Sequence, residues 1–562
     1  MHLCGSILFA LIQHPMPAKY YSIQYWKGQH LLLLAFLLLH TIASFYYISH
    51  QNITFDEPGY FEYSKRWLHG HPERIQPPDD SKSPIIAIAW VPRMVRQVIN
   101  PNYQLNDYGR KDQAEGRYMM ILFSFMTAVY VYKWCRQLYG DKGWWLPLLL
   151  LLFDPLYLSY STLISTDLAC GAFLLASLYH FNKYLVQQSQ KDFWLCALVT
   201  GIGIVTKTTL LFLLLLLPLL SICFHAYACR FKQLRSLKAI TKAVAFCCII
   251  LLVLNCAYYF RNTFLLFGDY HFESIFLNDL QHHNWLRQFP IPLPQAYVQQ
   301  LDMLKAHAEI GATIPARTYN GVYLFGTLKL TGGFWYYYLV LLFYKLPLGT
   351  LLLLLSCVPV FIKNYTKEGF VKRYMFLILP ILFFWIILSF FNHFQTGIRH
   401  ILLLFPLLFI GLGFLFNKLM FASRAWQFTA AGMVVYTFIT VALYYPFIIP
   451  YNNEFVTNKK TVYRKIFDSS IDYGQSDSSL NQFLDEHREY QSATINPSTG
   501  KHAVMMKQMF NTYIPWSDKY KWYRSLEPVG NYRYTILLFN ITKQDLEQAD
   551  FTKKDIKIVR TK

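Results

Sequence analysis

The sequence predicts a polytopic α-helical membrane protein with about eleven transmembrane helices and a small α/β domain at its carboxyl-terminal end. Apolar residues make up 54% of the 562 positions and aromatic residues 18%. Many apolar runs are long enough to cross a bilayer, which takes about 20 apolar residues in a helix. From about residue 449 these long runs stop and shorter patterns begin. A soluble fold would leave the long apolar runs unexplained.

The predicted spans follow the apolar runs in order along the chain. The first is a run rich in Leu and Phe that comes after a short amino-terminal tail. The spans lie near residues 30–48, 117–137, 145–163, 168–186, 193–206, 208–228, 240–260, 341–362, 374–391, 401–417 and 427–448.

The orientation of the spans follows from the positions of Lys and Arg in the short loops, because inner loops carry an excess of these residues. Every segment that would lie inside is basic, from Lys19 and Lys27 in the tail to Lys418 and Arg424 before the last span. The net charge of +20 is therefore largely a sign of topology. It is spread over many loops and forms no single patch suited to nucleic acid.

The topology divides the chain into three parts. Residues 1–29 form a cytoplasmic tail, and residues 30–448 form the transmembrane domain with large outer loops at 49–116 and 261–340. Residues 449–562 form the outer α/β domain, where YRYTILLFNI alternates like a strand and SSLNQFLDEHREY is typical of a helix. None of the ten cysteines lies in these outer parts, so no outer disulfide is expected and no spacing resembles a zinc site.

The first outer loop begins with a pair of carboxylates, Asp56 and Glu57, directly before Pro58. They could cap a helix that starts at the proline and complement its dipole. The same loop also contains Asp79, Asp80 and Lys82, which is more charge than a cap requires. We therefore interpret it as a site for chemistry at the outer membrane surface.

Two helices in this loop are expected to lie along the membrane. EPGYFEYSKRWLHG has aromatic residues at helical spacing, and PIIAIAWVPRMVRQVI has an apolar body. Arg93 and Arg96 would form the polar edge of the second helix. Packing elements under a soluble domain are the alternative.

Four cations fall near the outer ends of spans, against the charge bias: Lys82, Lys207, Lys345 and Arg399. A phosphate is the natural partner, because Arg offers paired donors and Lys a compact charge. The alternative for each is a long side chain that reaches the interface without a ligand. We favour the ligand for Lys82 and Arg399, favour the alternative for Lys207, and leave Lys345 open.

Asp167 lies at the tight outer turn between the third and fourth spans, where an ionisable residue is a candidate for function. Helix capping is the alternative, although Ser165 and Thr166 could also cap. His393 and His400 flank Arg399. Either could bind a metal, but a histidine near an interface is more often a structural hydrogen-bonding group.

Five motifs follow the acidic pair in order: DDSKSP, STDLACGAF, LTGGFWYYYLVLLFYKLPLG, GIRHILLLFP and DSSIDYGQ. In this order, and with this topology, the chain resembles the family 39 glycosyltransferases of the C-type membrane fold. That family includes protein O-mannosyltransferases and the lipid A aminoarabinose transferase. The resemblance runs from about residue 30 to the end of the chain.

The resemblance implies transfer of a sugar from a polyprenyl-phosphate carrier in the membrane to an acceptor on the outer face, with inversion at the anomeric carbon. By analogy Asp56 is the general base with Glu57 beside it, and Asp167 lines the same cavity. Lys82 and Arg399 hold the donor phosphate. Lys345 is a further candidate for that phosphate, and Asp80 and His400 are other candidates for the site.

Two departures from the family pattern bear on cofactor and compartment. Ser81 stands where aminoarabinose transferases place a metal-binding Glu, so no cofactor is assigned and a divalent metal ion stays an alternative. The outer domain lacks the sugar-binding repeats of the eukaryotic enzymes. We therefore expect a bacterial inner membrane protein whose site faces the periplasm or exterior, with a protein, lipid or polysaccharide as acceptor.

The alternative function is a transporter or flippase of lipid-linked sugars, because ionisable residues beside spans also mark translocation paths. Transporters tend to carry broken helices and polar groups near the midplane of the membrane. Here the candidates cluster at one face, which favours the transferase.

Overall fold

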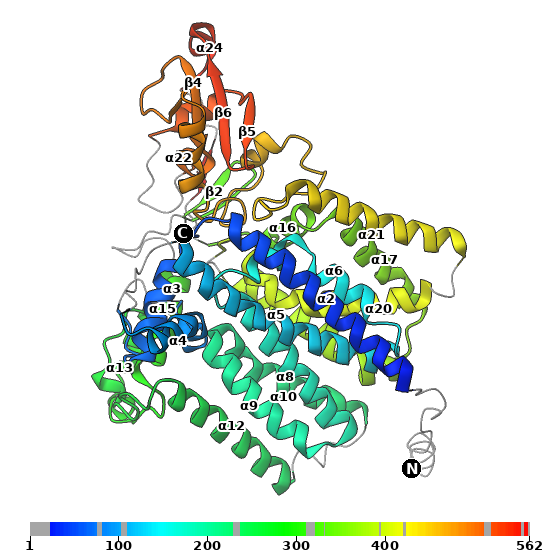
Figure 1. The fold of residues 1–562 in the computed structure, drawn as a ribbon. Helices are drawn as coiled ribbons and strands as arrows, with labels where there is room; N and C mark the ends of the chain where they lie inside the picture. Colours follow the sequence, from blue (N-terminus) through cyan, green and yellow to red (C-terminus); the bar gives the residue numbers. More distant parts are fainter. Residues whose placement is uncertain are drawn as a thin grey trace.

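The structure, a computed structural model, is a helical bundle with a smaller part containing strands at one end (Figure 1). It describes residues 23–75, 81–102, 110–228, 236–310, 321–330, 332–392, 395–419, 423–510, 519–551 and 556–559. Within these residues, seven helices are long and apolar enough to cross a membrane, by length and composition. The chain is therefore an integral membrane protein, as predicted. The count of eleven spans stays a prediction.

The first half of the bundle contains the helices expected from the apolar runs. They are α2 (Ile23–His50), α5 (Arg110–Tyr139), α6 (Trp145–Leu152), α7 (Pro155–Tyr160), α8 (Asp167–Gln187), α9 (Gln190–Thr206), η2 (Thr208–Phe212), α10 (Leu213–Tyr227) and α12 (Leu237–Ala257). The run near 145–163 is broken where Asp154 caps α7 by accepting from the backbone N–H groups of Leu156 and Tyr157.

The second half of the bundle begins with two helices separated by Pro347, which lacks a backbone donor. Its elements are α16 (Tyr337–Lys345), α17 (Leu348–Lys363), α18 (Lys367–Gly369), η5 (Phe370–Tyr374), α19 (Met375–Ile386), η6 (Ile387–Phe391), η7 (Ile398–Leu404), α20 (Phe405–Leu419) and α21 (Arg424–Tyr444).

Helix α8 is the central helix of the bundle, because nearly all its residues are buried. It packs against α5, α9 and η7. A Cβ built on Gly171 of α8 would lie 3.2 Å from the Cα of Leu403 in η7. The absence of a side chain at Gly171 thus lets η7 approach α8 closely, near the amino-terminal end of α8.

The first outer loop forms α3 (Glu57–Leu68), η1 (Pro84–Trp90) and α4 (Val91–Ile99). Helix α3 begins next to Pro58, as expected. The sequence predicted that Arg93 lies on a polar edge of α4. This prediction is wrong, because the side chain of Arg93 is fully buried. Its guanidinium lies 4.5 Å from the ring centre of Phe61 and 4.7 Å from that of Trp90. These rings hold the cation inside the fold.

The second outer loop forms η3 (Phe267–Asp269), α13 (Ile275–Gln281), α14 (Asn284–Arg287), α15 (Gln295–Ile310), β1 (Val322–Leu324) and β2 (Thr327–Lys329). Strands β1 and β2 pair antiparallel. Strand β2 also pairs in parallel with β7 (Lys557–Val559) near the end of the chain. This three-stranded sheet joins the second outer loop to the carboxyl-terminal part.

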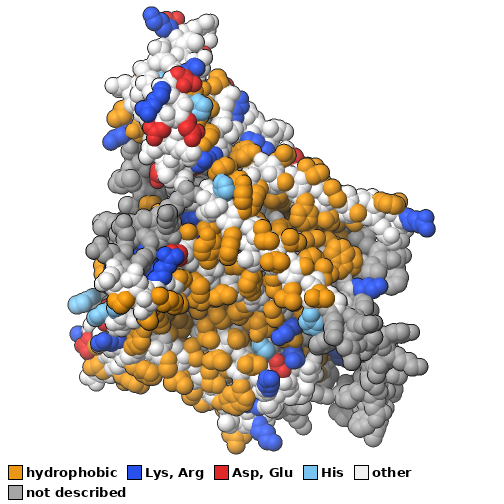
Figure 2. All heavy atoms as spheres, in the orientation of Figure 1, with side chains coloured by type: hydrophobic (Ala, Val, Ile, Leu, Met, Phe, Trp, Pro, Cys, Tyr) orange, Lys and Arg blue, Asp and Glu red, His pale blue; other side chains and the backbone are white. Residues whose placement is uncertain are grey.

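The chain after α21 contains both helices and strands, which lie at one end of the bundle (Figure 1). A four-stranded sheet has the order β3-β4-β6-β5. In Figure 2 the end of the molecule that contains this sheet carries many charged side chains, whereas apolar side chains cover much of the visible face of the bundle. The elements are η8 (Lys459–Arg464), α22 (Ser476–Glu486), β3 (Tyr490–Ser492), β4 (Gly500–Met505), α23 (Met506–Met509), η9 (Lys521–Ser525), β5 (Gly530–Tyr532), β6 (Ile536–Ile541) and α24 (Lys543–Gln548).

Candidate functional site

Asp56 lies in the turn between α2 and α3 and contacts residues from two distant parts of the chain. Arg399 Nη1, at the start of η7, lies 2.8 Å from Asp56 Oδ2. The hydroxyl of Tyr473 donates to the same oxygen at 2.5 Å and also accepts a hydrogen bond from Arg399. The side chains of Asp56 and Arg399 are 22% and 15% exposed. The site is thus half-buried and charged.

Lys82 lies beside this pair. Its Nζ is 3.9 Å from the ring centre of Tyr60 in α3, a cation–π contact. The backbone carbonyl of Lys82 accepts a hydrogen bond of 2.5 Å from Arg74. The residue is only 4% exposed. Its ammonium group is therefore buried against α3.

The charges of this group act directly on Asp56. Burial raises the pKa of Asp56, but the positive charges of Arg399 and Lys82 and the hydrogen bonds from Tyr473 and Arg399 outweigh burial and lower it to about 2. Asp56 is therefore ionised at neutral pH. It is a weak base as long as these cations face it.

A second ion pair lies nearby, between Asp167 at the start of α8 and Lys207 after α9, with Nζ and Oδ1 2.5 Å apart. Asp167 lies in the first turn of α8, where a carboxylate complements the helix dipole. Burial is the largest cause that raises the pKa of Tyr60, and the negative charges of Asp56 and Asp167 raise it further. Both carboxylates therefore lie near the Tyr60 hydroxyl.

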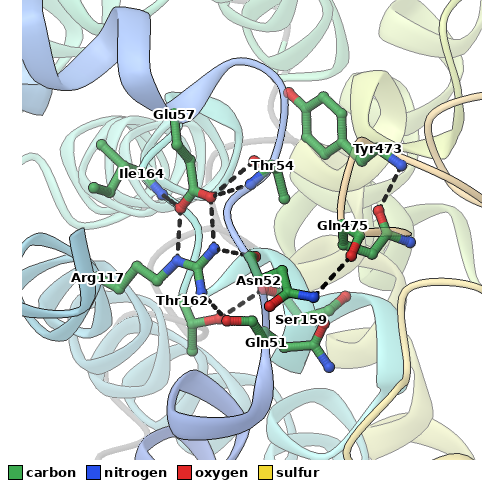
Figure 3. A network of polar contacts seen from close by, with 10 residues as sticks. All are labelled: Gln51, Asn52, Thr54, Glu57, Arg117, Ser159, Thr162, Ile164, Tyr473 and Gln475. Atoms are coloured by element: carbon green, nitrogen blue, oxygen red, sulfur yellow. Dashed lines mark hydrogen bonds and ion pairs between the residues drawn. The ribbon is translucent and has the colours of Figure 1, made fainter. Parts of the chain in front are cut away.

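Glu57 lies in a separate, buried network of polar contacts (Figure 3). Its carboxylate accepts from Arg117 Nη2 at 2.6 Å and Nε at 2.7 Å, from the backbone and hydroxyl of Thr54, and from the backbone N–H of Ile164 at 3.1 Å. Arg117 also donates to the carbonyl of Asn52. Burial raises the pKa of Glu57, but Arg117 and the hydrogen bonds lower it overall. This network fixes the turn that carries Asp56.

Lys345 is fully buried at the end of α16. Its Nζ donates to the carbonyl of Ser470 at 2.6 Å and to that of Ile449 at 3.4 Å. It therefore anchors the segment that carries Tyr473. The sequence analysis named Lys345 as a candidate for binding the donor phosphate, whereas the structure places its ammonium group against backbone carbonyls.

The segment 468–475 is tied to the turn before Arg399. Asp468 accepts from the hydroxyl of Tyr337 at 2.7 Å, and the same hydroxyl accepts from the backbone N–H of Gly397. Gly397 has a φ of 101°, and a Cβ there would lie 2.6 Å from Ser469 Oγ. Only glycine fits this contact. Arg399 and Tyr473 are thus held by one packed unit.

His400 is the one remaining candidate that the structure describes. His400 Nε2 lies 2.7 Å from the hydroxyl of Thr396. Asp79, Asp80 and His393 lie outside the described residues. Among the residues that the structure describes, no group of three His, Cys, Asp or Glu side chains could hold a metal ion.

Sequence reasoning missed three contributors to the site. The hydroxyl of Tyr473 and the aromatic face of Tyr60 belong to motifs that it noted, but their contacts depend on folding. Lys207 was interpreted as reaching the interface without a partner, yet it pairs with Asp167. The sequence places a basic and an acidic residue at the predicted outer ends of neighbouring spans. This arrangement is a signal that could have identified the pair.

Residues 108–259 match the family model for dolichyl-phosphate-mannose-protein mannosyltransferase. This segment resembles that mannosyltransferase family. It contains Arg117, one member of the pair with Glu57, and both members of the Asp167–Lys207 pair. The resemblance seen in the motifs is confirmed for this part of the chain, and the family model agrees with the C-type fold that the motifs predict.

Two crystal structures of ArnT from Cupriavidus metallidurans are similar to this chain, one bound to undecaprenyl phosphate and one in the apo state. The identities are 14% and 13%, and both TM-scores are 0.45. Each similarity covers 73% of this chain and 63% of the ArnT chain, so this chain spans less than two thirds of the length of ArnT. No curated protein matches the sequence.

Proposed function

We propose that the chain is a membrane glycosyltransferase that moves a sugar from a polyprenyl-phosphate carrier to an acceptor at the outer face of the membrane. The observation that carries this proposal is the group formed by Asp56, Arg399 and Lys82. A carboxylate and two cations from separate parts of the chain gather where α2 ends and η7 begins, beside the strand-containing part. The family match over residues 108–259 supports the same class of reaction.

In the proposed reaction Asp56 is the general base. The acceptor hydroxyl or amine attacks the anomeric carbon while Asp56 takes its proton, and the bond from that carbon to the phosphate oxygen breaks. The electron pair of that bond stays with the polyprenyl phosphate. A single displacement inverts the anomeric centre, so a β-linked donor gives an α-linked product.

The cations bind the phosphate in this proposal. Lys82 and Arg399 neutralise the charge that develops on the leaving phosphate, a task for which Arg offers two parallel donors. Asp167, held by Lys207, faces the same space and orients the acceptor or the sugar. A water-poor setting beside the membrane strengthens these charge interactions.

Glu57 and Lys345 have supporting positions in this account. Glu57 fixes the turn that carries Asp56 through Arg117, and Lys345 fixes the segment that carries Tyr473. We therefore propose that neither touches the substrates. The orientation proposed from the sequence places the site in the periplasm or exterior of a bacterial cell.

The proposal is tested with purified protein in lipid and a panel of polyprenyl-phosphate sugars. We expect one donor of the panel to be consumed, with release of polyprenyl phosphate, and consumption to increase when the cognate protein, lipid or polysaccharide acceptor is added. A lipid-linked sugar that crosses the bilayer unaltered, with no donor consumed, would instead favour the flippase. Glycan profiling of a strain lacking the gene then identifies the acceptor.

A further inference from the structure

The guanidinium of Arg399 contacts the proposed base Asp56 and is also part of the proposed phosphate site. Its Nη1 contacts Asp56 at 2.8 Å, and its Nη2 has a longer contact of 3.4 Å to the hydroxyl of Thr396. A guanidinium has five N–H donors. Arg399 can therefore keep part of its contacts while it turns other donors to a phosphate.

The surroundings of Arg399 favour a movement of its side chain alone. The backbone at Gly397 is packed against Ser469 and Asp468, and Ser469 donates to the carbonyl of Thr396. These contacts hold the backbone of the turn. The guanidinium itself is partly exposed, at 15%, and can change its partner without moving η7.

Asp56 would keep one contact if Arg399 turned away, because Tyr473 also holds it. The Tyr473 hydroxyl donates to Asp56 Oδ2. The backbone carbonyl of Tyr473 accepts from the N–H of Phe55 at 2.7 Å, and its N–H donates to Gln475 at 2.6 Å (Figure 3). The tyrosine is thus fixed to the turn that carries Asp56.

We propose that Arg399 is shared between the Asp56 carboxylate and the phosphate of the donor, so that its shift to the leaving phosphate frees Asp56 to take the acceptor proton. This inference rests on the function proposed above and deepens it. Under this proposal Asp56 becomes a strong base only when the phosphate is bound.

The charges balance in this step. The acceptor oxygen or nitrogen forms its bond to the anomeric carbon and loses its proton to Asp56, which becomes neutral. The phosphate leaves with the electrons of the broken bond and gains one negative charge. Arg399 therefore loses an anionic partner at Asp56 at the same time as the phosphate becomes a stronger one.

Several charged and titratable groups near Asp56 determine its protonation state. Lys82 and Arg399 keep it ionised, and the Tyr473 hydroxyl stabilises the carboxylate. Tyr60, His400, Asp167 and Lys207 lie in the same electrostatic neighbourhood. The pKa of Tyr473 is raised, first by burial, so this hydroxyl stays a donor. Arg399 contacts the Asp56 carboxylate directly, so its shift to a phosphate raises the proton affinity of Asp56.

The test is infrared difference spectroscopy of the full-length protein in lipid, with and without undecaprenyl phosphate. With its pKa at about 2, Asp56 is protonated at well under about 1% at pH 4.5, whereas a carboxyl with the ordinary value of about 3.9 is protonated at about 20%. We expect undecaprenyl phosphate to add a protonated-carboxyl band that Asp56→Asn lacks.

Two arginine variants separate the shared-cation account from a simple charge effect. Arg399→Gln should show the band before undecaprenyl phosphate is added and gain less on addition than the wild type. Arg488→Gln, which changes a side chain that is 84% exposed, should behave as the wild type does.

Retention of labelled undecaprenyl phosphate by the same samples separates the two proposals. If the lipid binds but the band does not change, or if Arg399→Gln stays as unprotonated as the wild type, the shared role of Arg399 is wrong and the transferase proposal stands. If the lipid does not bind to the wild type, both are wrong.

Discussion

Arg399 Nη1 lies 2.8 Å from Asp56 Oδ2, although 343 positions separate the two residues in the sequence. The contact joins the first outer loop to an element in the second half of the bundle. Tyr473 adds a third segment, from the part of the chain after the last helix of the bundle. The site therefore forms only when all three segments are folded together, and substitutions in each segment should affect the same reaction.

Tyr473→Phe should lower turnover by roughly tenfold to a hundredfold, the worth of a hydrogen bond to a charged group, about 1.5–3 kcal/mol. The hydroxyl stabilises ionised Asp56 and orients it, so its loss should also move the acidic limb of the pH profile upward. Donor KM should change little. Turnover and pH profiles of Tyr473→Phe are compared with those of Tyr365→Phe, a tyrosine that is 50% exposed. Equal turnover and pH profiles for both variants would show that the Tyr473 hydroxyl does not contribute to the reaction.

Lys82→Ala and Arg399→Ala should each raise the KM for the lipid-linked donor by roughly tenfold to a hundredfold, because each loses a charge-assisted hydrogen bond to phosphate. The KM for the acceptor should change much less. Lys305→Ala is the control, since Lys305 is 45% exposed and pairs with Glu309 on its own helix. An equal rise in acceptor KM would argue against a phosphate site.

Glu57→Gln should destabilise the protein by about 3–5 kcal/mol at neutral pH, because it leaves the buried cation of Arg117 without its counter-ion. The side chains of the pair are only 3% and 1% exposed. Replacing both residues by apolar ones of similar volume should cost less than either single change. Thermal unfolding of the three variants in lipid gives the comparison.

The effect of Glu57→Gln should depend on pH in one direction. The pKa of Glu57 is lowered from 4.5 in the folded protein, so its stabilising contribution is present above pH 4.5 and is lost as the pH falls through the folded value. The difference in unfolding temperature between wild type and variant should therefore shrink below about pH 4.5. A difference that grows on acidification would contradict the buried ion pair.

The first outer loop and α22 should face the same compartment. Single cysteines in place of Glu62 and Ser478, in a variant without the native cysteines, should react with an impermeant thiol reagent in spheroplasts. A cysteine in place of Lys191, in a predicted inner loop, should react only after lysis. Labelling of only one of the two outer positions would break the predicted topology.

The sequence predicted the bundle well because long apolar runs mark helices directly. It also singled out Asp56, Lys82 and Arg399, since charges at outer ends of spans stand out against the charge bias. It did not predict that Glu57 turns to Arg117, because spans are apolar on most faces and their sequence does not show which side meets a neighbour. The close approach of α8 and η7 at Gly171 likewise exists only in the packed bundle.

The central claim is that Asp56 accepts the acceptor's proton during sugar transfer, and Asp56→Asn tests it most directly. The measurement is the rate of polyprenyl phosphate release from the preferred lipid-linked sugar in the presence of acceptor, with binding of undecaprenyl phosphate measured on the same folded samples. We expect the variant to keep the lipid and to lose transfer by about a hundredfold or more, as for other general bases. Transfer at a rate near that of the wild type by a folded Asp56→Asn protein would contradict the account.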